Sequence, residues 1–369
     1  MTKPKTQQLH LIQLLRAVAI LFVMLGHLNG LLYKRYAQDW FGMGEWGRTG
    51  GVDMFFVISG FMIAYLYKHK IGESGQAGIF LQKRITRIIP YYWLTTFGVL
   101  SILLIFPYFG EQFSLTYVIQ SMFLLSDDPI LTVAWSLTHI FFFYFMFTLL
   151  LFKPTFGRLT IAAYLTCIVT FYFIDFYPEN MLAATLLNVS NLTIWLGAFV
   201  AFVLTTSRVK INTIIGGTLT AIGIAAFLFI WSNNTYQFIT IEQGTIRPLL
   251  YGISSCFLVA GLASIDLYQK TKINKLLHHI GKASFSIFMT HSLFLMLSIV
   301  IFIENLKLQQ LLGWDITMLT IILLTTIGGL LAYQFVEKPL NKRLNTLLNR
   351  RKTNQYPLPA NKLLIKVRR

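Results

Sequence analysis

The sequence predicts an all-α polytopic membrane protein with about ten transmembrane helices and with both chain ends in the cytoplasm. Composition is the first observation, because 55% of the 369 residues are hydrophobic and only 12% are charged, which is too apolar for a soluble domain. Ten apolar stretches are also long enough to cross a bilayer. Finally, Lys and Arg gather in alternate connecting segments.

Each predicted span contains roughly 20 mostly apolar residues, and each is expected to be helical because lipid offers no partner to free backbone groups. In chain order the spans are 11–33, 51–67, 90–106, 132–152, 159–177, 181–204, 211–231, 248–265, 283–303 and 314–336. Pro90 is expected to open the third helix, since proline suits the first helical turn. The apolar stretch 113–125 is too short to span and is expected to be re-entrant or to lie on the surface.

The charge distribution predicts the orientation. With the N-terminus inside, 25 of the 31 Lys and Arg residues fall in cytoplasmic segments and five in outer loops, as positive-inside topology requires. Ten of them lie from Lys338 onward. We therefore interpret residues 1–340 as a transmembrane domain and 341–369 as a basic cytoplasmic tail that contacts anionic membrane lipids. The net charge of +17 then predicts no nucleic acid partner.

Ionisable side chains inside the hydrocarbon are costly and usually functional, which singles out Arg16, His27 and Asp53. At ~1.5 Å of rise per residue, Arg16 lies roughly 8 Å and His27 roughly 24 Å into the first span. Asp53, on the returning span, lies about 6 Å from the outer boundary of a ~30 Å core. His27 and Asp53 are therefore expected to share a depth. The carboxylate would orient an imidazole that acts as a general base, and the alternative is a simple packing pair.

Two arginines between the second and third spans form the next candidate site. Arg84 and Arg87 lie one helical turn apart on one face, so their guanidinium groups could fork onto the phosphate oxygens of a cytoplasmic ligand. The alternative is anchoring to lipid headgroups at the inner surface.

Five further polar or aromatic residues are predicted to line a substrate path, although each also has a structural interpretation. An interfacial belt explains Trp135 and Ser136, a bundle hydrogen bond explains His291, and a boundary ion pair explains Glu337. Ser59 completes the set. Cys167 and Cys256 lie in apolar stretches and are interpreted as buried side chains. No metal is expected, because the histidines lack ligand spacing with carboxylates or thiols.

Six short motifs occur in order from the first span to the last. They are LRAVAI at 15–20 followed by His27, GVDMFFVISGF at 51–61, RITRIIP at 84–90, AWSL at 134–137 followed by Phe143-Tyr144, SIFMTH at 286–291 and FVEKP at 335–339. In this order and spacing the sequence resembles the acyltransferase 3 family of bacterial membrane O-acyltransferases. The second and third motifs are the most specific.

The resemblance implies a ten-span core in the bacterial inner membrane that uses cytoplasmic acyl-CoA, usually acetyl-CoA, to acylate a sugar hydroxyl. It implies that His27 is the catalytic residue, supported by Arg16, and that Arg84 and Arg87 serve donor use or structure. The chain is expected to be a stand-alone member without a fused outer hydrolase-like domain. Many relatives carry Glu where this sequence has Ile140, so either the carboxylate is dispensable or His139 partly replaces it.

We therefore predict an O-acetyltransferase that acts on a glycan or glycolipid acceptor such as lipopolysaccharide O-antigen, capsule or exopolysaccharide. His27 would deprotonate the sugar hydroxyl or hold the acyl group transiently, and Arg16, Arg84 and Arg87 would bind the CoA end. Two alternatives stay open. One is a transporter or flippase of a lipid-linked sugar with a proton relay between His27 and Asp53. The other is transfer of a different acyl group, such as succinyl.

Overall fold

The computed structural model describes residues 7–44, 49–105, 114–126, 128–176, 178–206, 211–241, 246–269 and 271–355. Every regular element in these residues is a helix, and ten helices there are long and apolar enough to cross a membrane. The predicted all-α class with about ten membrane-spanning helices is thus confirmed. In chain order the α-helices are α1 (His10–Tyr36), α2 (Gly51–Tyr67), α3 (Gln76–Ile105), α4 (Leu115–Met122), α5 (Trp135–Phe152), α6 (Pro154–Phe173), α7 (Met181–Leu186), α8 (Ser190–Thr206), α9 (Thr213–Tyr236), α10 (Ile246–Tyr268), α11 (Lys275–Ser298), α12 (Leu308–Ala332) and α13 (Lys338–Gln355).

The start of α3 differs from the sequence-based expectation. Helix α3 begins at Gln76 and carries Pro90 in its interior instead of opening there. The added turns are amphipathic, because Phe80 and Ile88 are buried while Lys83 is exposed, so tertiary packing extends the helix beyond its apolar span. The short stretch around α4 forms an eight-residue helix, too short to span, as predicted.

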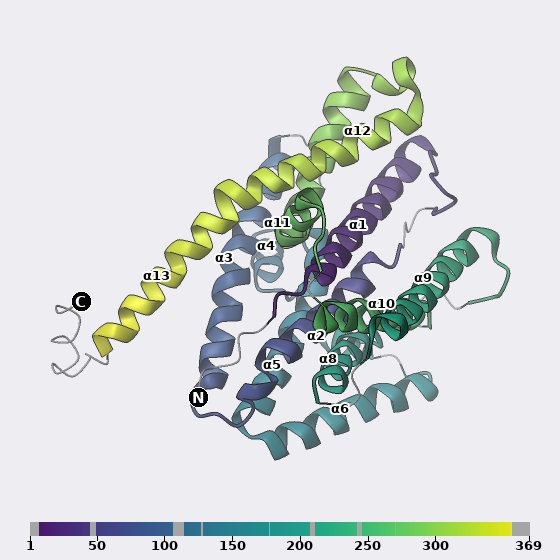
Figure 1. Ribbon diagram of the computed structural model, residues 1–369. Helices are drawn as coiled ribbons and strands as arrows, with labels where there is room; N and C mark the ends of the chain where they lie inside the picture. The colour runs from purple at the N-terminus through teal and green to yellow at the C-terminus, as the bar shows by residue number, and fades with distance from the viewer. Residues whose placement is uncertain are drawn as a thin grey trace.

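The last helices form one long element along a flank of the bundle (Figure 1). Helix α12 is kinked at Gly313, where φ is 81°, so its straight part begins at Trp314. It continues through a π-helical segment, Tyr333–Glu337, into α13. The first part of the predicted tail is therefore helical, and residues 356–369 lie outside the described part of the chain.

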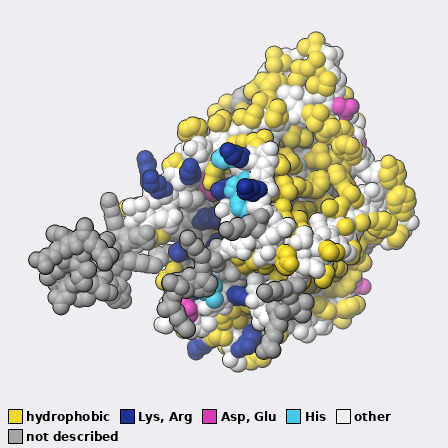
Figure 2. Space-filling view, in the orientation of Figure 1, with side chains coloured by type: hydrophobic (Ala, Val, Ile, Leu, Met, Phe, Trp, Pro, Cys, Tyr) yellow, Lys and Arg dark blue, Asp and Glu magenta, His cyan; other side chains and the backbone are white. Residues whose placement is uncertain are grey.

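Side-chain chemistry divides the visible face of the molecule (Figure 2). Apolar side chains cover one side of this face, whereas Lys and Arg gather on the side from which α13 projects. Such a division fits a bundle whose apolar belt faces lipid and whose basic end faces anionic headgroups.

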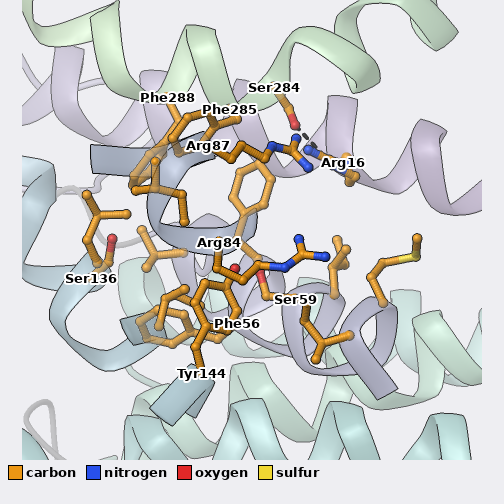
Figure 3. Close-up of a pocket in the computed structure, with 18 residues that line it drawn as sticks. Arg16, Phe56, Ser59, Arg84, Arg87, Ser136, Tyr144, Ser284, Phe285 and Phe288 are labelled. Atoms are coloured by element: carbon orange, nitrogen blue, oxygen red, sulfur yellow. Dashed lines mark hydrogen bonds between the residues drawn. The ribbon is translucent and has the colours of Figure 1, made fainter. Parts of the chain in front are cut away.

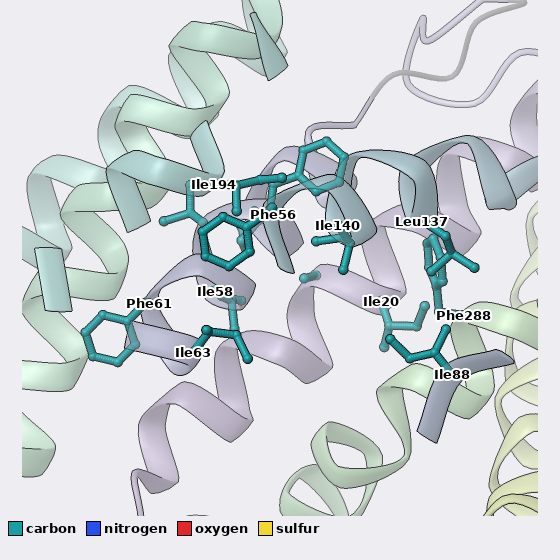
Figure 4. Packing of buried hydrophobic residues seen from close by; sticks show 14 of the residues in the cluster. Ile20, Phe56, Ile58, Phe61, Ile63, Ile88, Leu137, Ile140, Ile194 and Phe288 are labelled. Carbon is teal, nitrogen blue, oxygen red and sulfur yellow. The ribbon is translucent and has the colours of Figure 1, made fainter. Parts of the chain in front are cut away.

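Helix α2 is locked against α8 by two glycines. A Cβ at Gly60 would overlap the carbonyl oxygen of Ile194, and a Cβ at Gly197 would overlap that of Val57. Small residues at such a crossing let two backbones approach closely, which is how helices associate in lipid. Around this crossing lies the apolar core, in which Phe56, Phe61 and Ile194 are buried (Figure 4).

The start of α1 is held by a residue of α10. No side chain of α1 itself caps the helix at Leu9. Instead the backbone N–H of Leu11 donates to Oδ2 of Asp266 at 2.7 Å, and the N–H of Ile12 donates to the same oxygen at 3.4 Å. Asp266 is only 1% exposed. A carboxylate satisfies the free N–H groups of a helix start and interacts favourably with its dipole, so α10 fixes the position of α1.

Candidate active site

A cavity of about 150 Å³ lies among α1, α2, α3, α5 and α11. Three arginines, Arg16, Arg84 and Arg87, line it together with mostly apolar side chains. In Figure 3 the three guanidinium groups lie on one side of the cavity and Ser136 lies on the opposite side. The cavity thus has a cationic end and an apolar body, and the structure brings Arg16 together with the Arg84 and Arg87 pair, which lies far from it in the sequence.

Arg16 is oriented by a serine of α11. Its Nε donates to Oγ of Ser284 at 3.1 Å, and both residues line the cavity. Because this bond uses the Nε–H, the two terminal nitrogens of the guanidinium stay available for a ligand. Arg16 lies beside Arg87 (Figure 3), and the carboxylate of Glu337, which interacts electrostatically with both arginines, offsets part of the repulsion between these two cations.

Arg84 is held by a ring of aromatic side chains. A terminal nitrogen donates to the hydroxyl of Tyr67 at 3.2 Å. The guanidinium carbon lies 5.3 Å from the ring centre of Tyr67 and 5.4 Å from that of Phe80, and 5.9 Å from the ring of Tyr144. These distances allow cation–π attraction. The aromatic residues therefore fix a half-buried cation at the cavity wall.

A second cavity, of about 410 Å³, adjoins the first. It lies between α3 and α13, and its lining residues are Lys83, Arg84, Thr86, Arg87, Asn341, Leu344 and Asn345. Arg84 and Arg87 line both cavities, and Arg87 is exposed. The larger cavity is therefore basic and polar, and the arginine pair joins it to the narrower, more apolar one.

His27 lies against a second histidine. The ring centres of His27 and His291 are 5.0 Å apart, with 60° between the planes. His291 is fully buried and its Nδ1 lies 2.7 Å from the carbonyl oxygen of Phe288. A carbonyl only accepts, so Nδ1 carries the hydrogen and Nε2 carries a lone pair. No other described residue hydrogen-bonds to this Nε2.

The first cavity, which is lined by Arg16, Arg84 and Arg87, is called the arginine cavity. Two phenylalanines lie between it and the histidine pair. Phe55 and Phe288 both line the cavity, and their ring centres are 5.9 Å apart. The Phe288 ring is also 5.9 Å from the ring of His291. The apolar end of the cavity therefore borders directly on the His27–His291 pair.

The register between α1 and α2 does not bring Asp53 to the depth of His27. A Cβ at Gly51 would meet backbone atoms of Ala19 and Val23, and the hydroxyl of Tyr65 donates to the carbonyl oxygen of Gln7 at 3.2 Å. Residue 51 of α2 thus lies at the level of about residue 21 of α1, and residue 65 lies at the level of residue 7. By the same antiparallel register, Asp53 lies at the level of about residue 19 of α1. That level is eight residues before His27, or about 12 Å of helix rise.

The physical reason is that the chain re-enters the bundle before α2 begins. The hydroxyl of Thr49 donates to the carbonyl oxygen of Phe22 at 2.6 Å, so non-helical backbone already lies beside the middle of α1. Hydropathy cannot show this, because it counts depth from the first apolar residue. Asp53 is buried, and the equal depth predicted for it and His27 is wrong. The direct relay on which the transporter alternative depended loses its geometric basis.

The remaining predicted site residues are distributed over several places. Ser59 and Ser136 line the first cavity, whereas Trp135 lines a separate third cavity. Glu337 is buried in the π-helical segment, where Asn341 donates to its Oε1 at 3.5 Å. Glu337 does not line any of these three cavities. Within the described ranges, no group of His, Cys, Asp and Glu could hold a metal ion.

Sequence reasoning gave no role to several residues that position the site. Ser284 holds Arg16, and Tyr67 and Phe80 hold Arg84. The signal for Ser284 was its place two helical turns before His291 on the same face. No sequence signal links Tyr67 or Phe80 to Arg84, because that contact depends on how α2 and α3 pack.

A helical membrane bundle with an internal cationic cavity and an adjoining histidine pair has the architecture of a membrane-embedded enzyme. The family model of an acyltransferase domain, acyltransferase 3, matches residues 9–334, so the chain belongs to this family.

Two curated relatives are similar in sequence. The exopolysaccharide production protein ExoZ of Rhizobium meliloti (strain 1021) is 27% identical over 313 residues, which cover 80% of this chain and 90% of that protein. Protein 2 in the picA locus of Rhizobium radiobacter is 32% identical over 95 residues, which cover 26% of this chain and 45% of that protein. No solved structure matches the chain.

Proposed function

We propose that this protein is an inner-membrane O-acyltransferase that moves an acetyl group from cytoplasmic acetyl-CoA to a hydroxyl of a cell-surface polysaccharide or its precursor. The observation that carries the proposal is the pair of cavities that meet at Arg84 and Arg87. Their sizes and lining residues suit the two parts of an acyl-CoA, a bulky phosphorylated nucleotide and a thin arm that ends in a thioester.

The larger cavity suits the nucleotide. Lys83, Arg84 and Arg87 supply positive charge, and Asn341 and Asn345 supply amide groups for the base and ribose. Guanidinium groups bind phosphate oxygens in a fork geometry. The narrower cavity, with its apolar walls, suits the pantetheine arm and brings the thioester to Phe55 and Phe288, next to the histidine pair.

The reaction then needs one base. A ring nitrogen of His27 takes the proton of the acceptor hydroxyl while the hydroxyl oxygen bonds to the acyl carbon. The carbon–sulfur bond breaks, and the proton passes to the CoA thiolate. Nε2 of His291 accepts a hydrogen bond from His27 as the imidazolium forms, which is the role that sequence reasoning gave to Asp53. Arg16 lies at the cationic end, where it would contact the donor.

Two features support the choice of acceptor and acyl group. The name of the relative from Rhizobium meliloti refers to exopolysaccharide production, which favours an exopolysaccharide or its precursor as acceptor. Rings of phenylalanine close the apolar end of the cavity, which favours an acetyl group over a charged succinyl group, because a carboxylate there would lack a partner.

Ligand binding to purified protein tests the donor site. Arg87→Ala should weaken acetyl-CoA binding by about tenfold or more, the loss of one charge-assisted phosphate contact, and should leave binding of S-acetyl-pantetheine unchanged. Arg158→Ala is the matched control, because Arg158 is exposed on α6 and lines none of the three cavities. Equal acetyl-CoA binding in Arg84→Ala, Arg87→Ala and Arg158→Ala would contradict the donor site and favour the alternative that Arg84 and Arg87 bind lipid headgroups.

Activity in cells tests the reaction. His27→Ala, expressed at the wild-type level, should abolish the acyl groups on the surface glycan, measured by mass spectrometry. Unchanged acyl content would contradict the role of His27. Transfer from succinyl-CoA at a rate equal to that from acetyl-CoA would overturn the choice of acetyl.

A further inference from the structure

A third cavity, of about 230 Å³, lies apart from the arginine cavity. It is formed by the start of α5, the segment before α5 that contains Ser126, and α7 with the segment that follows it. Its lining residues are Ser126, Trp135, Thr138, His139, Ala184, Thr185 and Asn188. Hydroxyl, amide and imidazole groups dominate this lining, with a single tryptophan, which is unlike the apolar surfaces that face lipid.

The tautomer of His139 is fixed by its neighbour Asn191. The side-chain amide nitrogen of Asn191 donates to the carbonyl oxygens of Thr185 at 2.8 Å, Leu186 at 3.0 Å and Asn188 at 3.1 Å. The amide oxygen is therefore the atom that faces Nδ1 of His139, at 2.9 Å. An amide oxygen only accepts, so Nδ1 carries the hydrogen.

Nε2 of His139 is consequently a hydrogen-bond acceptor. The His139 residue is 4% exposed, it lines the cavity, and no described residue donates to its Nε2. The lone pair of Nε2 is open to a hydrogen-bond donor from a ligand in the cavity. A ligand with a hydroxyl donor would satisfy the atom, and a sugar ring offers several.

Trp135 supplies the second recognition element. It is half-buried and lines the same cavity, with its ring centre 5.6 Å from that of His139 at 89°. An indole face packs well against the C–H face of a sugar ring, because its π-system is negative and sugar C–H groups are weakly positive.

Phe56 separates this cavity from the arginine cavity. Its ring lies 6.0 Å from that of Trp135 and 5.6 Å from that of His139, and the same side chain lines the arginine cavity. One aromatic ring thus forms a shared wall between the proposed donor side and the polar cavity. The positive-inside count predicts that the start of α5 and α7 lie toward the outer face, where a surface glycan would arrive.

We propose that the cavity of Trp135 and His139 binds one sugar unit of the acceptor glycan, with a sugar hydroxyl donating to Nε2 of His139 and the ring packing on Trp135. This inference rests on the proposed function and assigns its acceptor site. It also gives His139 a role different from replacing the family carboxylate, because Ile140 faces the arginine cavity while His139 faces the other one.

A single substitution isolates the acceptor atom. In His139→Asn the amide nitrogen can keep the hydrogen bond to Asn191, but nothing replaces Nε2. Proteoliposomes with acetyl-CoA and de-O-acylated oligosaccharides from the producing cell's own polysaccharide should show about a tenfold rise in the oligosaccharide KM. The KM for acetyl-CoA should not change. Thr138→Val, which removes a cavity hydroxyl at constant shape, should give a smaller rise of the same kind.

Chemical labelling tests the cavity independently of these variants. In cells, a membrane-impermeant maleimide should label Ala184→Cys and stop acylation of the surface glycan, while purified labelled protein still binds acetyl-CoA. Leu182→Cys is the matched control, because Leu182 is exposed on the same short helix but does not line the cavity. Its labelling should leave acylation intact.

Separate outcomes distinguish this inference from the proposed function. If His139→Asn and labelled Ala184→Cys transfer normally while His27→Ala is inactive, the acceptor site lies elsewhere and the proposed function stands. If wild-type protein neither binds acetyl-CoA nor transfers its acyl group, both fail together. Failure of the impermeant reagent to reach Ala184→Cys would also overturn the site.

Discussion

His291 faces His27 with the rings 5.0 Å apart, and the carbonyl oxygen of Phe288, 2.7 Å from Nδ1, fixes which nitrogen of His291 carries a lone pair. A buried acceptor beside a base can orient that base and stabilise its protonated form, as a carboxylate does in catalytic triads. Two helices that are distant in the sequence, α1 and α11, therefore build one functional unit.

His291→Asn tests this unit. The asparagine amide can keep the hydrogen bond to Phe288 while Nε2 is lost. We expect kcat to fall by about 10²-fold, the lower end for groups that assist proton transfer, with an unchanged Kd for acetyl-CoA. Steady-state kinetics in proteoliposomes and equilibrium binding measure the two quantities.

A merely structural role for His291 predicts a different pattern. In that case His291→Asn would lower thermal stability and acetyl-CoA binding together, and any remaining folded protein would keep its kcat. His291→Gln, which places an amide near Nε2 but cannot take a proton, should recover part of the loss if orientation is what matters.

Phe288→Ala tests the boundary between the arginine cavity and the histidine pair. Removal of the ring lengthens the apolar end of the cavity, so butyryl-CoA should gain relative to acetyl-CoA. One methylene in a hydrophobic pocket changes specificity by about 10- to 200-fold, and a shift near the lower value is expected. The measurement is the ratio of kcat/KM for the two donors.

Loss of an aromatic ring elsewhere is the control for this substitution. Phe142 packs on Tyr164 with ring centres 5.0 Å apart and does not line the arginine cavity. Phe142→Ala should therefore leave the donor ratio at its wild-type value. A ratio that is unchanged in Phe288→Ala as well would mean that the acyl group does not reach this ring.

Arg16 and Ser284 allow a graded test of the cationic end. Ser284→Ala removes the hydrogen bond to Nε and should raise the KM for acetyl-CoA by about three- to tenfold, since one such bond contributes about 1 kcal/mol. Arg16→Lys keeps the charge but loses the planar fork, so a larger rise is expected. If Ser284→Ala and Arg16→Lys both behave as wild type, Arg16 does not contact the donor.

Hydropathy placed most of the membrane-spanning helices correctly, because long apolar stretches leave a signal that needs no tertiary information. Arg84 and Arg87 were likewise recognisable as a pair, since one helical turn puts them on one face. The residue that contacts His27, in contrast, could not be recognised from the sequence. That residue, His291, lies in the ninth span, eight spans further along the chain. The segment around Thr49 re-enters the bundle before α2, so Asp53 lies about 12 Å from the level of His27, which corresponds to eight residues of helix rise.

The same limit applies to the polar cavity around His139. Trp135 and Ser136 are adjacent in sequence, yet one lines the third cavity and the other the arginine cavity. Neighbouring residues on a helix point in directions about 100° apart, so a motif that contains both cannot be assigned to one site without the packing of α5.

Asp266→Asn should destabilise the protein through the start of α1. The amide still offers one oxygen to Leu11, but the negative charge at the helix start is lost. We expect a decrease of about 1 kcal/mol in the free energy of unfolding. Asp266→Ala, which leaves the N–H groups of half-buried Leu11 and buried Ile12 without this partner, should cost about 1–3 kcal/mol. Thermal unfolding in detergent, followed by circular dichroism, measures both.

Asp266→Ala should also lower acyl-transfer activity, because α1 carries both Arg16 and His27. An Asp266→Ala protein with wild-type stability would contradict the capping role. Asp175, which is exposed just after the end of α6, offers the control Asp175→Asn, expected to be neutral.

The crossing of α2 and α8 gives the last prediction. Gly60→Ala places a methyl group against the carbonyl oxygen of Ile194, so the helices must separate, and overpacking of this kind costs about 1–3 kcal/mol. Helix α2 also carries Phe55, Phe56 and Ser59 into the cavities, so separation should weaken acetyl-CoA binding as well as stability. Gly217→Ala on α9 meets no atom within 4 Å and should be neutral or slightly stabilising, because alanine favours the helix. Equal melting temperatures for the two variants would mean that the crossing tolerates a wider spacing and that α2 is not fixed by α8.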